Sequence, residues 1–332
     1  MNLTIQSKKS IALLISLMLA CIALSQRAHA VVPAPDGGYP GDNTAEGQNA
    51  LLSLSTGTYN TAIGLFSLLS NTDANFNTAI GAGALLVNTA EENTATGAGA
   101  LLSSTTGVRN TAQGAFALFS NTEGSFNTAT GVEALLKNTT GNVNTAIGAG
   151  ALTNNTTGHH NTAVGGDFVL FSNTTGTHDT AIGVDSLASN TTGLQNTANG
   201  AFTLSNNTTG AQNTAVGYAA LTSNTTAGAD TNGANTAVGA FALQNNTTSG
   251  ANTAIGYAAL ANVTTNGGNT AIGDLAGFNI TGGQNICIGA GVGGFAATTT
   301  RSKLALTCRT LRALQPAISA AFSTSCPAEA PC

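Results

Sequence analysis

The chain is predicted to be an all-β protein, a parallel β-solenoid of about 15 coils, on three observations. A core unit of Asn-Thr-Ala-hydrophobic-Gly recurs, mostly every 17 residues, between residues 43 and 290. Seventeen residues are too few for two packed helices, and Asn, Thr and Gly form helices weakly. The fifth residue of each unit is Gly, which suits a corner because it accepts a positive φ. Each unit therefore predicts one coil, with a short strand, a Gly corner, a second short strand and a turn.

The repeat unit occurs fifteen times, and its first residue is Asn in all copies but one. These first residues are Asn43, Asn60, Asn77, Asn93, Asn110, Asn127, Asn144, Asn161, Asp179, Asn196, Asn213, Asn235, Asn252, Asn269 and Asn285. The step from Asn213 to Asn235 is longer than the others, and the extra residues, near 227–233, predict a surface loop.

Composition excludes some classes of protein. Only 7% of residues are charged, and between Val31 and Thr300 the only basic residues are Arg109 and Lys137. Nucleic-acid binding needs clustered Lys and Arg, so no nucleic-acid partner is expected. No apolar run after the N-terminus is long enough to cross a bilayer, so no transmembrane anchor is expected.

Residues 1–30 are predicted to be a signal peptide. Lys8 and Lys9 supply its positive end, a mostly apolar stretch follows, and Ala28-His29-Ala30 has the form of a cleavage site. We therefore expect an exported protein of a bacterium, extracellular or at the cell surface, that begins at Val31 with a short leader over 31–42.

The last residues, 291–332, differ from the repeats in composition. The stretch 302–314 is compatible with a short amphipathic helix that caps the solenoid, and a change of reading frame is the alternative origin. After cleavage of the signal peptide the cysteines that remain are Cys287, Cys308, Cys326 and Cys332. Export permits disulfides among them, and unpaired thiols are the alternative.

Strand alternation assigns the two sides of each strand. Thr145 and Ile147 point one way, and the bulky aliphatic side is expected to face the coil interior. The opposite side carries Ala, and Ala146, Ala215 and Ala254 are therefore predicted to contact a neighbouring chain. The alternative is a narrow solenoid whose interior needs small residues on both sides.

A structural ladder is predicted along the rod axis. Stacked Asn side chains can donate hydrogen bonds from one coil to the next, so the Asn column needs no ligand. The ladder and its corner glycines are represented by Asn60, Asn77, Asn144, Asn161, Asn252, Gly64, Gly81, Gly148 and Gly256. The many Asn-x-Thr sequons are interpreted as a by-product of turn chemistry and not as glycosylation sites.

No catalytic constellation is found in the sequence, so we expect no enzyme activity and no cofactor. Paired carboxylates occur only at Glu91 and Glu92, in a predicted turn. His160 and His178 precede the first residues of consecutive units, and Asp179 is near them, so these three are the candidate metal ligands. Turn histidines are usually only exposed, and no bound metal is the expectation.

The repeats resemble the heads of trimeric autotransporter adhesins of the YadA type. The resemblance covers Asn43 to about Gly289 and is carried by the Asn-Thr-Ala-Ile-Gly units at 60–64, 77–81, 144–148, 252–256 and 269–273. It implies a left-handed parallel β-roll, a homotrimer of chains side by side, and adhesion to a matrix, a host or neighbouring cells. The family's repeat is shorter than this one, and its coiled-coil stalk and C-terminal barrel anchor are not recognised here.

Three functions are compared. The sequence favours a secreted or cell-surface adhesin-like rod whose ligand is unknown, and a phage-fibre-like protein has similar repeats. An ice-binding solenoid needs outward Thr ranks, whereas Thr is expected here on the inward side. A polysaccharide hydrolase needs acidic clusters that this sequence does not have.

Overall fold

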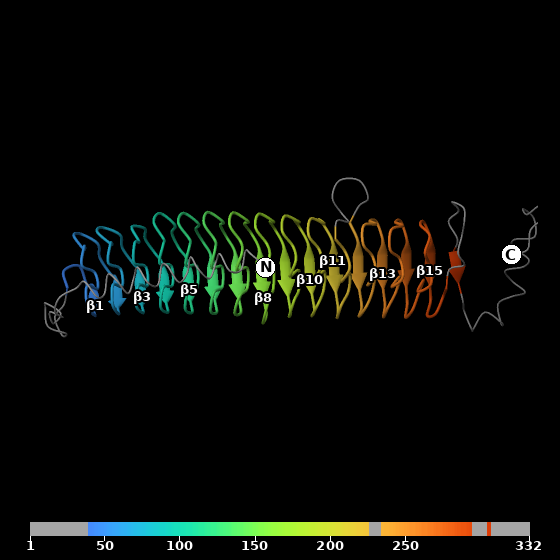
Figure 1. The fold of residues 1–332 in the computed structure, drawn as a ribbon, viewed down its shortest axis with the longest axis horizontal. Helices are drawn as coiled ribbons and strands as arrows, with labels where there is room; N and C mark the ends of the chain where they lie inside the picture. The colour runs from blue at the N-terminus through green and yellow to red at the C-terminus, as the bar shows by residue number, and fades with distance from the viewer. Residues whose placement is uncertain (1–38, 226–233, 294–303, 307–332) are drawn as a thin grey trace, which may run out of the picture.

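The described part of the chain stacks into one long rod (Figure 1). The computed structural model describes residues 39–225, 234–293 and 304–306. Successive repeat units contribute successive coils, and the strands pair in chain order as one parallel sheet. The predicted all-β solenoid with a repeat of about 17 residues is confirmed. The predicted signal peptide and most of the leader lie outside the described residues.

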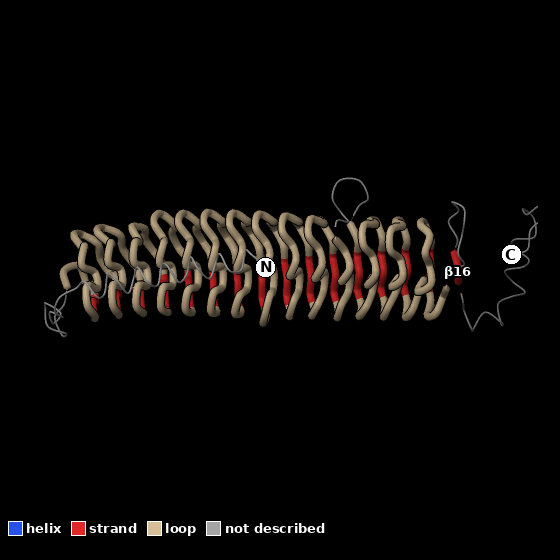
Figure 2. The backbone as a smooth tube through the Cα atoms, in the orientation of Figure 1, coloured by secondary structure: helices blue, strands red, loops and turns tan. Residues whose placement is uncertain are grey.

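Each of the fifteen units contributes one strand of three residues, β16 follows the last unit, and these strands lie in a single row along the rod (Figure 2). The strands are β1 (Thr44–Glu46), β2 (Thr61–Ile63), β3 (Thr78–Ile80), β4 (Thr94–Thr96), β5 (Thr111–Gln113), β6 (Thr128–Thr130), β7 (Thr145–Ile147), β8 (Thr162–Val164), β9 (Thr180–Ile182), β10 (Thr197–Asn199), β11 (Thr214–Val216), β12 (Thr236–Val238), β13 (Thr253–Ile255), β14 (Thr270–Ile272), β15 (Ile286–Ile288) and β16 (Leu304–Leu306).

The second short strand predicted in each unit does not form. The residues after the Gly corner are turns and bends, although their backbones still bond from coil to coil. The amide of Leu118, for example, donates to the carbonyl of Ala134 at 2.9 Å, and the amide of Ser120 donates to that of Leu136 at 3.0 Å. The coils are thus held together around much of their circumference and not only at the strands.

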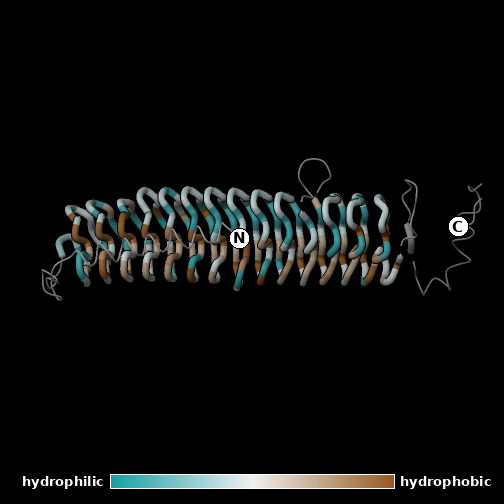
Figure 3. The backbone as a smooth tube through the Cα atoms, viewed as in Figure 1, coloured by the Kyte–Doolittle hydropathy of each residue, from teal (hydrophilic) through white to brown (hydrophobic). Residues whose placement is uncertain are grey.

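The strands stack in exact register, with like residues on like residues. β7 pairs with β8 so that Thr145 lies beside Thr162 and Ala146 beside Ala163. The longer step before β12 leaves this register intact, because Thr214 of β11 still pairs with Thr236. Residues of similar hydropathy consequently form stripes along the rod (Figure 3). The predicted loop at 227–233 lies outside the described residues.

The tight coil depends on a left-handed backbone at residues that are not glycine. In the coil that begins at Asn127, Glu133, Leu135 and Val143 have φ of 58°, 53° and 57°. These are the seventh, ninth and seventeenth positions of the unit, and the same positions are left-handed in most coils. Because side chains disfavour this region, the stacked neighbours must hold it in place.

The predicted inside and outside of the strand are reversed. Ala146, Ala215 and Ala254 are fully buried in the solenoid interior, so they cannot contact a second chain. Ile147, which was expected inside, is 42% exposed. The narrow-solenoid alternative is correct in placing the Ala column inside, but the interior is not small on both sides, because the opposite wall brings a larger side chain to the same space.

That larger side chain is the ninth residue of the unit. It forms a column of buried leucines, all with positive φ, at Leu51, Leu68, Leu85, Leu101, Leu118, Leu135, Leu152, Leu170, Leu187, Leu204, Leu221, Leu243 and Leu260. An Ala at the third position leaves room for this Leu within one thin coil. The core is therefore a set of stacked Ala and Leu columns that runs the length of the rod.

The corner glycines are essential to the stack. Gly114 has φ of +136°, and a Cβ placed there would lie 2.5 Å from the carbonyl oxygen of Gly131 in the next coil. We expect Gly114→Ala to lower the free energy of unfolding by about 3 kcal/mol or more, measured by urea denaturation. Gly166 is the matched control, because its Cβ would meet only one side-chain atom, at 3.9 Å. Equal unfolding midpoints for the two Ala variants would contradict this account.

Two further predictions concern the ends of the chain and the membrane. The expected helix over 302–314 is not formed at Leu304–Leu306, which are a strand, β16, paired with β15. The rest of that stretch lies outside the described residues. Among the residues described, no helix has the length and hydrophobicity needed to cross a membrane.

Candidate functional site

The interior carries the Asn column that begins each unit. The Oδ1 of Asn127 accepts the backbone N–H of Asn144 at 2.9 Å and its side-chain amide at 3.1 Å. The same Asn144 amide also donates to the carbonyl of Gly158 at 2.9 Å. The predicted ladder positions at Asn60, Asn77, Asn161 and Asn252 are buried in the same column. Apart from the side-chain amide nitrogen of Asn77, which has no hydrogen-bond partner among the described residues, these side chains bond to one another and to the turn backbone, which is a structural task.

A second Asn ladder lies at the twelfth position, where only a turn was predicted. Asn138 donates to Asn121 Oδ1 at 2.7 Å and to the Gly141 carbonyl at 2.9 Å. The column comprises Asn71, Asn88, Asn121, Asn138, Asn155, Asn173, Asn190, Asn207, Asn224 and Asn246, all fully buried. The signal that could have found it is the recurrence of Asn at one fixed position of the unit. Because these asparagines are inside, the sequons that begin at them are not accessible to glycosylation.

Asp179 replaces Asn in the first ladder and is buried there. Its carboxylate accepts the backbone N–H of Asn196 at 2.8 Å and the side-chain amides of Asn196 and Asn190 at 3.0 and 3.1 Å. Burial raises the pKa of Asp179 to about 7, even though these hydrogen bonds act in the opposite direction. The ladder thus contains one ionisable group in a position built for an uncharged amide.

The candidate metal ligands do not converge. His160 and His178 stack with ring centroids 4.9 Å apart, and His159 lies edge-on to both. Asp179 belongs to the interior ladder, so it does not join the histidines on the outer turn. Among the described residues, no three His, Cys, Asp or Glu side chains are placed to hold a metal ion. The combination of His160, His178 and Asp179 as ligands is therefore wrong.

The paired carboxylates at Glu91 and Glu92 bond in opposite directions. Glu91 accepts the side-chain amide of Asn75 at 2.8 Å, one coil earlier. Glu92 forms an ion pair with Arg109, one coil later, and the hydrogen bond from Arg109 lowers the pKa of Glu92. Arg109 also lies over the ring of Phe126, 5.5 Å from its centroid. The two carboxylates therefore act as separate surface groups and not as an acid–base pair.

The outer face of the sheet, called here the strand face, carries the second and fourth residues of each unit. Thr, the second residue of the unit, is the first residue of every strand from β1 to β14. The fourth position is most often Ile or Val, and Ile63, Ile147 and Ile255 are 40%, 42% and 40% exposed. Among strands β1 to β15, Glu46 in the first is the only charged residue. The strand face is thus a long, nearly uncharged surface with a partly exposed apolar column.

A second exposed feature is an aromatic row, defined as Phe202, Tyr218, Phe241 and Tyr257. The row lies in four successive coils at the sixth and seventh positions, just beyond the Gly corner. Neighbouring ring centroids are 5.7, 5.4 and 5.7 Å apart, and the rings are nearly perpendicular, with interplanar angles of 79° to 88°. Tyr218 and Tyr257 remain 51% and 52% exposed. The repeat consensus gives no sign of this row.

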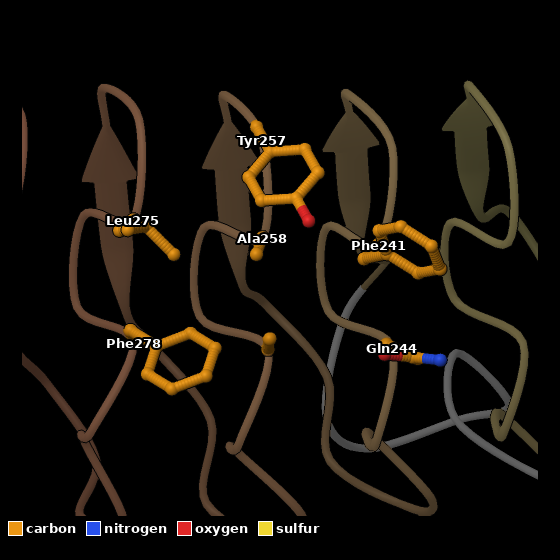
Figure 4. Close-up of a pocket in the computed structure, with 7 residues that line it drawn as sticks. Phe241, Gln244, Tyr257, Ala258, Leu275 and Phe278 are labelled. Carbon is orange, nitrogen blue, oxygen red and sulfur yellow. The ribbon is translucent and has the colours of Figure 1, made fainter.

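An open cavity of about 340 Å³ lies at one end of the aromatic row (Figure 4). It is lined by side chains of three adjacent coils, among them Phe241, Gln244, Tyr257, Leu275 and Phe278. The lining contains no charged residue. The cavity therefore extends the exposed apolar surface of the aromatic row toward the C-terminal coils.

The thiol of Cys287 lies at the third position of its unit, where other coils have Ala. It is free and 2% exposed, and burial raises its pKa. The remaining cysteines considered for disulfides, Cys308, Cys326 and Cys332, lie outside the described residues.

Comparison of the chain with family models, curated proteins and solved structures gives no match. The functional interpretation accordingly depends on the geometry of the rod and on its two exposed features, the strand face and the aromatic row.

Proposed function

We propose that this protein is a non-enzymatic structural or adhesive rod of the cell exterior, whose chains assemble side by side through the strand face. The observation that carries the proposal is the strand face itself, an exposed apolar column along a rigid rod. Large exposed apolar surfaces on soluble proteins usually mark contacts. Export is supported by the signal-like N-terminus described above.

The strand face has the composition of a protein–protein contact. Charged residues are depleted at the centres of interfaces, and here Glu46 lies at one end of the row. The apolar column includes Ile80, Ile182 and Ile272, which are 39%, 39% and 40% exposed. A partner that covered them would remove this apolar surface from water.

The size of the strand face suits a stable contact. Fifteen strands at about 4.8 Å per coil give a rod of roughly 70 Å, and each strand is about 10 Å wide. The product, on the order of 700 Å² per chain, approaches the ~800 Å² per partner of a standard interface. Smaller areas are typical of weak or lattice contacts.

Three chains are the proposed number, as in the adhesin heads that the repeats resemble. The sequence suggested the Ala column as the contact between chains. Because that column is buried, the proposed contact is the opposite side of the same strands. Side-by-side rods would present several copies of each outer turn together. Such multivalency strengthens adhesion when each single site is weak.

The test is the mass of the mature protein in solution, by light scattering after size-exclusion chromatography. We expect three times the chain mass for the wild type and a smaller mass for the triple variant Ile147→Glu, Ile182→Glu and Ile255→Glu, because charge on this face opposes burial. The control variant Thr140→Glu, Thr157→Glu and Thr192→Glu adds the same charge on exposed turns and should keep the wild-type mass. A wild-type protein that is a folded monomer would remove side-by-side assembly.

Ice binding is a second candidate function, favoured by one observation. The Thr column lies on the outer side of the strands, in register over β1 to β14, so the objection that Thr faces inward no longer applies. A thermal-hysteresis measurement on the mature protein decides this candidate. Arrested ice growth would favour it over adhesion, and ordinary freezing would exclude it.

A further inference from the structure

We propose that the aromatic row binds an extended, neutral, β-1,4-linked polysaccharide. This inference adds a ligand class to the proposed adhesive role. It does not depend on side-by-side assembly, because the row lies at the sixth and seventh positions of the unit, outside the strands. Three features of the row support this ligand: the spacing of the rings, the absence of charge in the described residues of their four coils and the amides nearby.

The rings form a row with a repeat of two coils, in which each ring is nearly perpendicular to the next. Tyr is at the sixth position in one coil and Phe at the seventh in the next, so Tyr218 and Tyr257 are two coils apart, about 10 Å along the rod. An extended β-1,4-linked chain repeats every two sugars at nearly this distance. The polarised C–H bonds of a pyranose face pack well on the negative face of an aromatic ring.

The described residues of the four coils that carry the row are uncharged, and the nearest carboxylates, Asp185 and Asp274, lie in the coils on either side. From Asn196 to Gly273 the only charged residue in the sequence is Asp230, which lies outside the described residues. Nucleic acids and acidic polysaccharides need cationic side chains, and basic peptides need carboxylates. The ligand that suits this stretch is therefore a neutral polymer.

Amide side chains lie next to the rings. Gln244 lines the cavity together with Phe241 and Tyr257. Asn245, which follows Gln244, donates to Asn262 Oδ1 at 3.2 Å, and Asn206 is exposed. Amides both donate and accept, as sugar hydroxyls do. A proline-rich peptide, the other polymer that docks on aromatic grooves, offers mostly acceptors and would leave the amide oxygens unpaired.

The experiment is isothermal titration of the mature protein with cellohexaose and with chitohexaose. We expect binding of at least one of them, weakened by about tenfold or more in the double variant Tyr218→Ala and Tyr257→Ala. The variant Tyr218→Phe and Tyr257→Phe keeps the rings and should retain most of the affinity. The control is Tyr59→Ala and Phe76→Ala, which removes a separate exposed aromatic stack, with centroids 5.3 Å apart, and should bind like the wild type.

Several results would overturn the proposal. They are no binding of either oligosaccharide, equal binding by the wild type and the Tyr→Ala variant, or binding of a polyproline peptide in place of the sugars. The same titration on the triple Glu variant of the strand face separates the two proposals. Retained sugar binding there, with loss of oligomer mass, would support both, whereas a monomeric wild type that binds sugar would support only the present one.

Discussion

Replacement of Ala146, Ala215 and Ala254 by Leu should unfold the solenoid and leave no folded monomer. Each of these side chains is fully buried against the Leu column, so added methyl groups have no space. Overpacking costs about 1–3 kcal/mol at each site, and the sites are far enough apart to add. The sum, about 3–9 kcal/mol, is comparable with the whole stability of a typical domain.

Circular dichroism and light scattering on one sample measure this result. We expect loss of the β-spectrum in the triple variant. Ala149→Leu is the matched control, because Ala149 is exposed three residues further along the coil of Ala146. It should leave spectrum and mass unchanged. A triple variant with an intact β-spectrum and a smaller oligomer mass would instead mean that the Ala side is a chain contact.

The variant Asp179→Asn should stabilise the rod at neutral and alkaline pH. The pKa of Asp179 rises from 3.8 to about 7 on folding, so the folded state favours the protonated form. The contribution of Asp179 to the free energy of unfolding is therefore fully present below pH 3.8, and it is lost as the pH rises to about 7. A shift of this size corresponds to about 4 kcal/mol, which we treat as an upper bound.

Urea denaturation at pH 4 and pH 8 measures the difference. The wild type should lose stability between the two pH values, while Asp179→Asn, which restores the ladder amide, should change much less over that interval. Asp185→Asn removes the same charge from a partly exposed position in the same coil and is the control. If the two variants and the wild type have equal midpoints at pH 8, burial of the Asp179 charge is not costly.

The period, the strand and the Gly corner could be predicted from the sequence because each is a local property of the repeat. The recurrence of Thr-Ala-hydrophobic-Gly predicts the strand, and the fixed Gly requires a positive φ. The direction of the strand faces could not be predicted from side-chain size alone. Ile147 is larger than Ala146, yet the interior is filled by Leu152 from the opposite wall. That Leu adopts φ of 53°, a conformation that a Leu in a sequence does not signal.

The candidate sites were only partly predictable for a similar reason. The Asn ladder at the first position follows from recurrence, and the ladder at the twelfth position was hidden by the turn-like sequence around Asn138. The aromatic row was missed because its members alternate between two positions of the unit, as Tyr218 and Phe241 do. Neither position is aromatic in every copy, so a consensus of the repeat conceals the row.

The central claim is that the Ala side of each strand faces the solenoid interior. The strand face, the core and the effects expected at Ala146 and Asp179 all depend on it. It can be measured by maleimide labelling of Ala79→Cys and Ile80→Cys, each made in the triple Glu variant so that assembly cannot cover the face. Ala79 is fully buried and Ile80 is 39% exposed. Buried Cys287, at the same unit position as Ala79, shows that a thiol is accommodated there and provides an internal reference. Peptide mapping should find rapid modification of the thiol at position 80 in the native protein, and modification at 79 and 287 only after unfolding. Rapid labelling at position 79 with protection at position 80 would contradict the account.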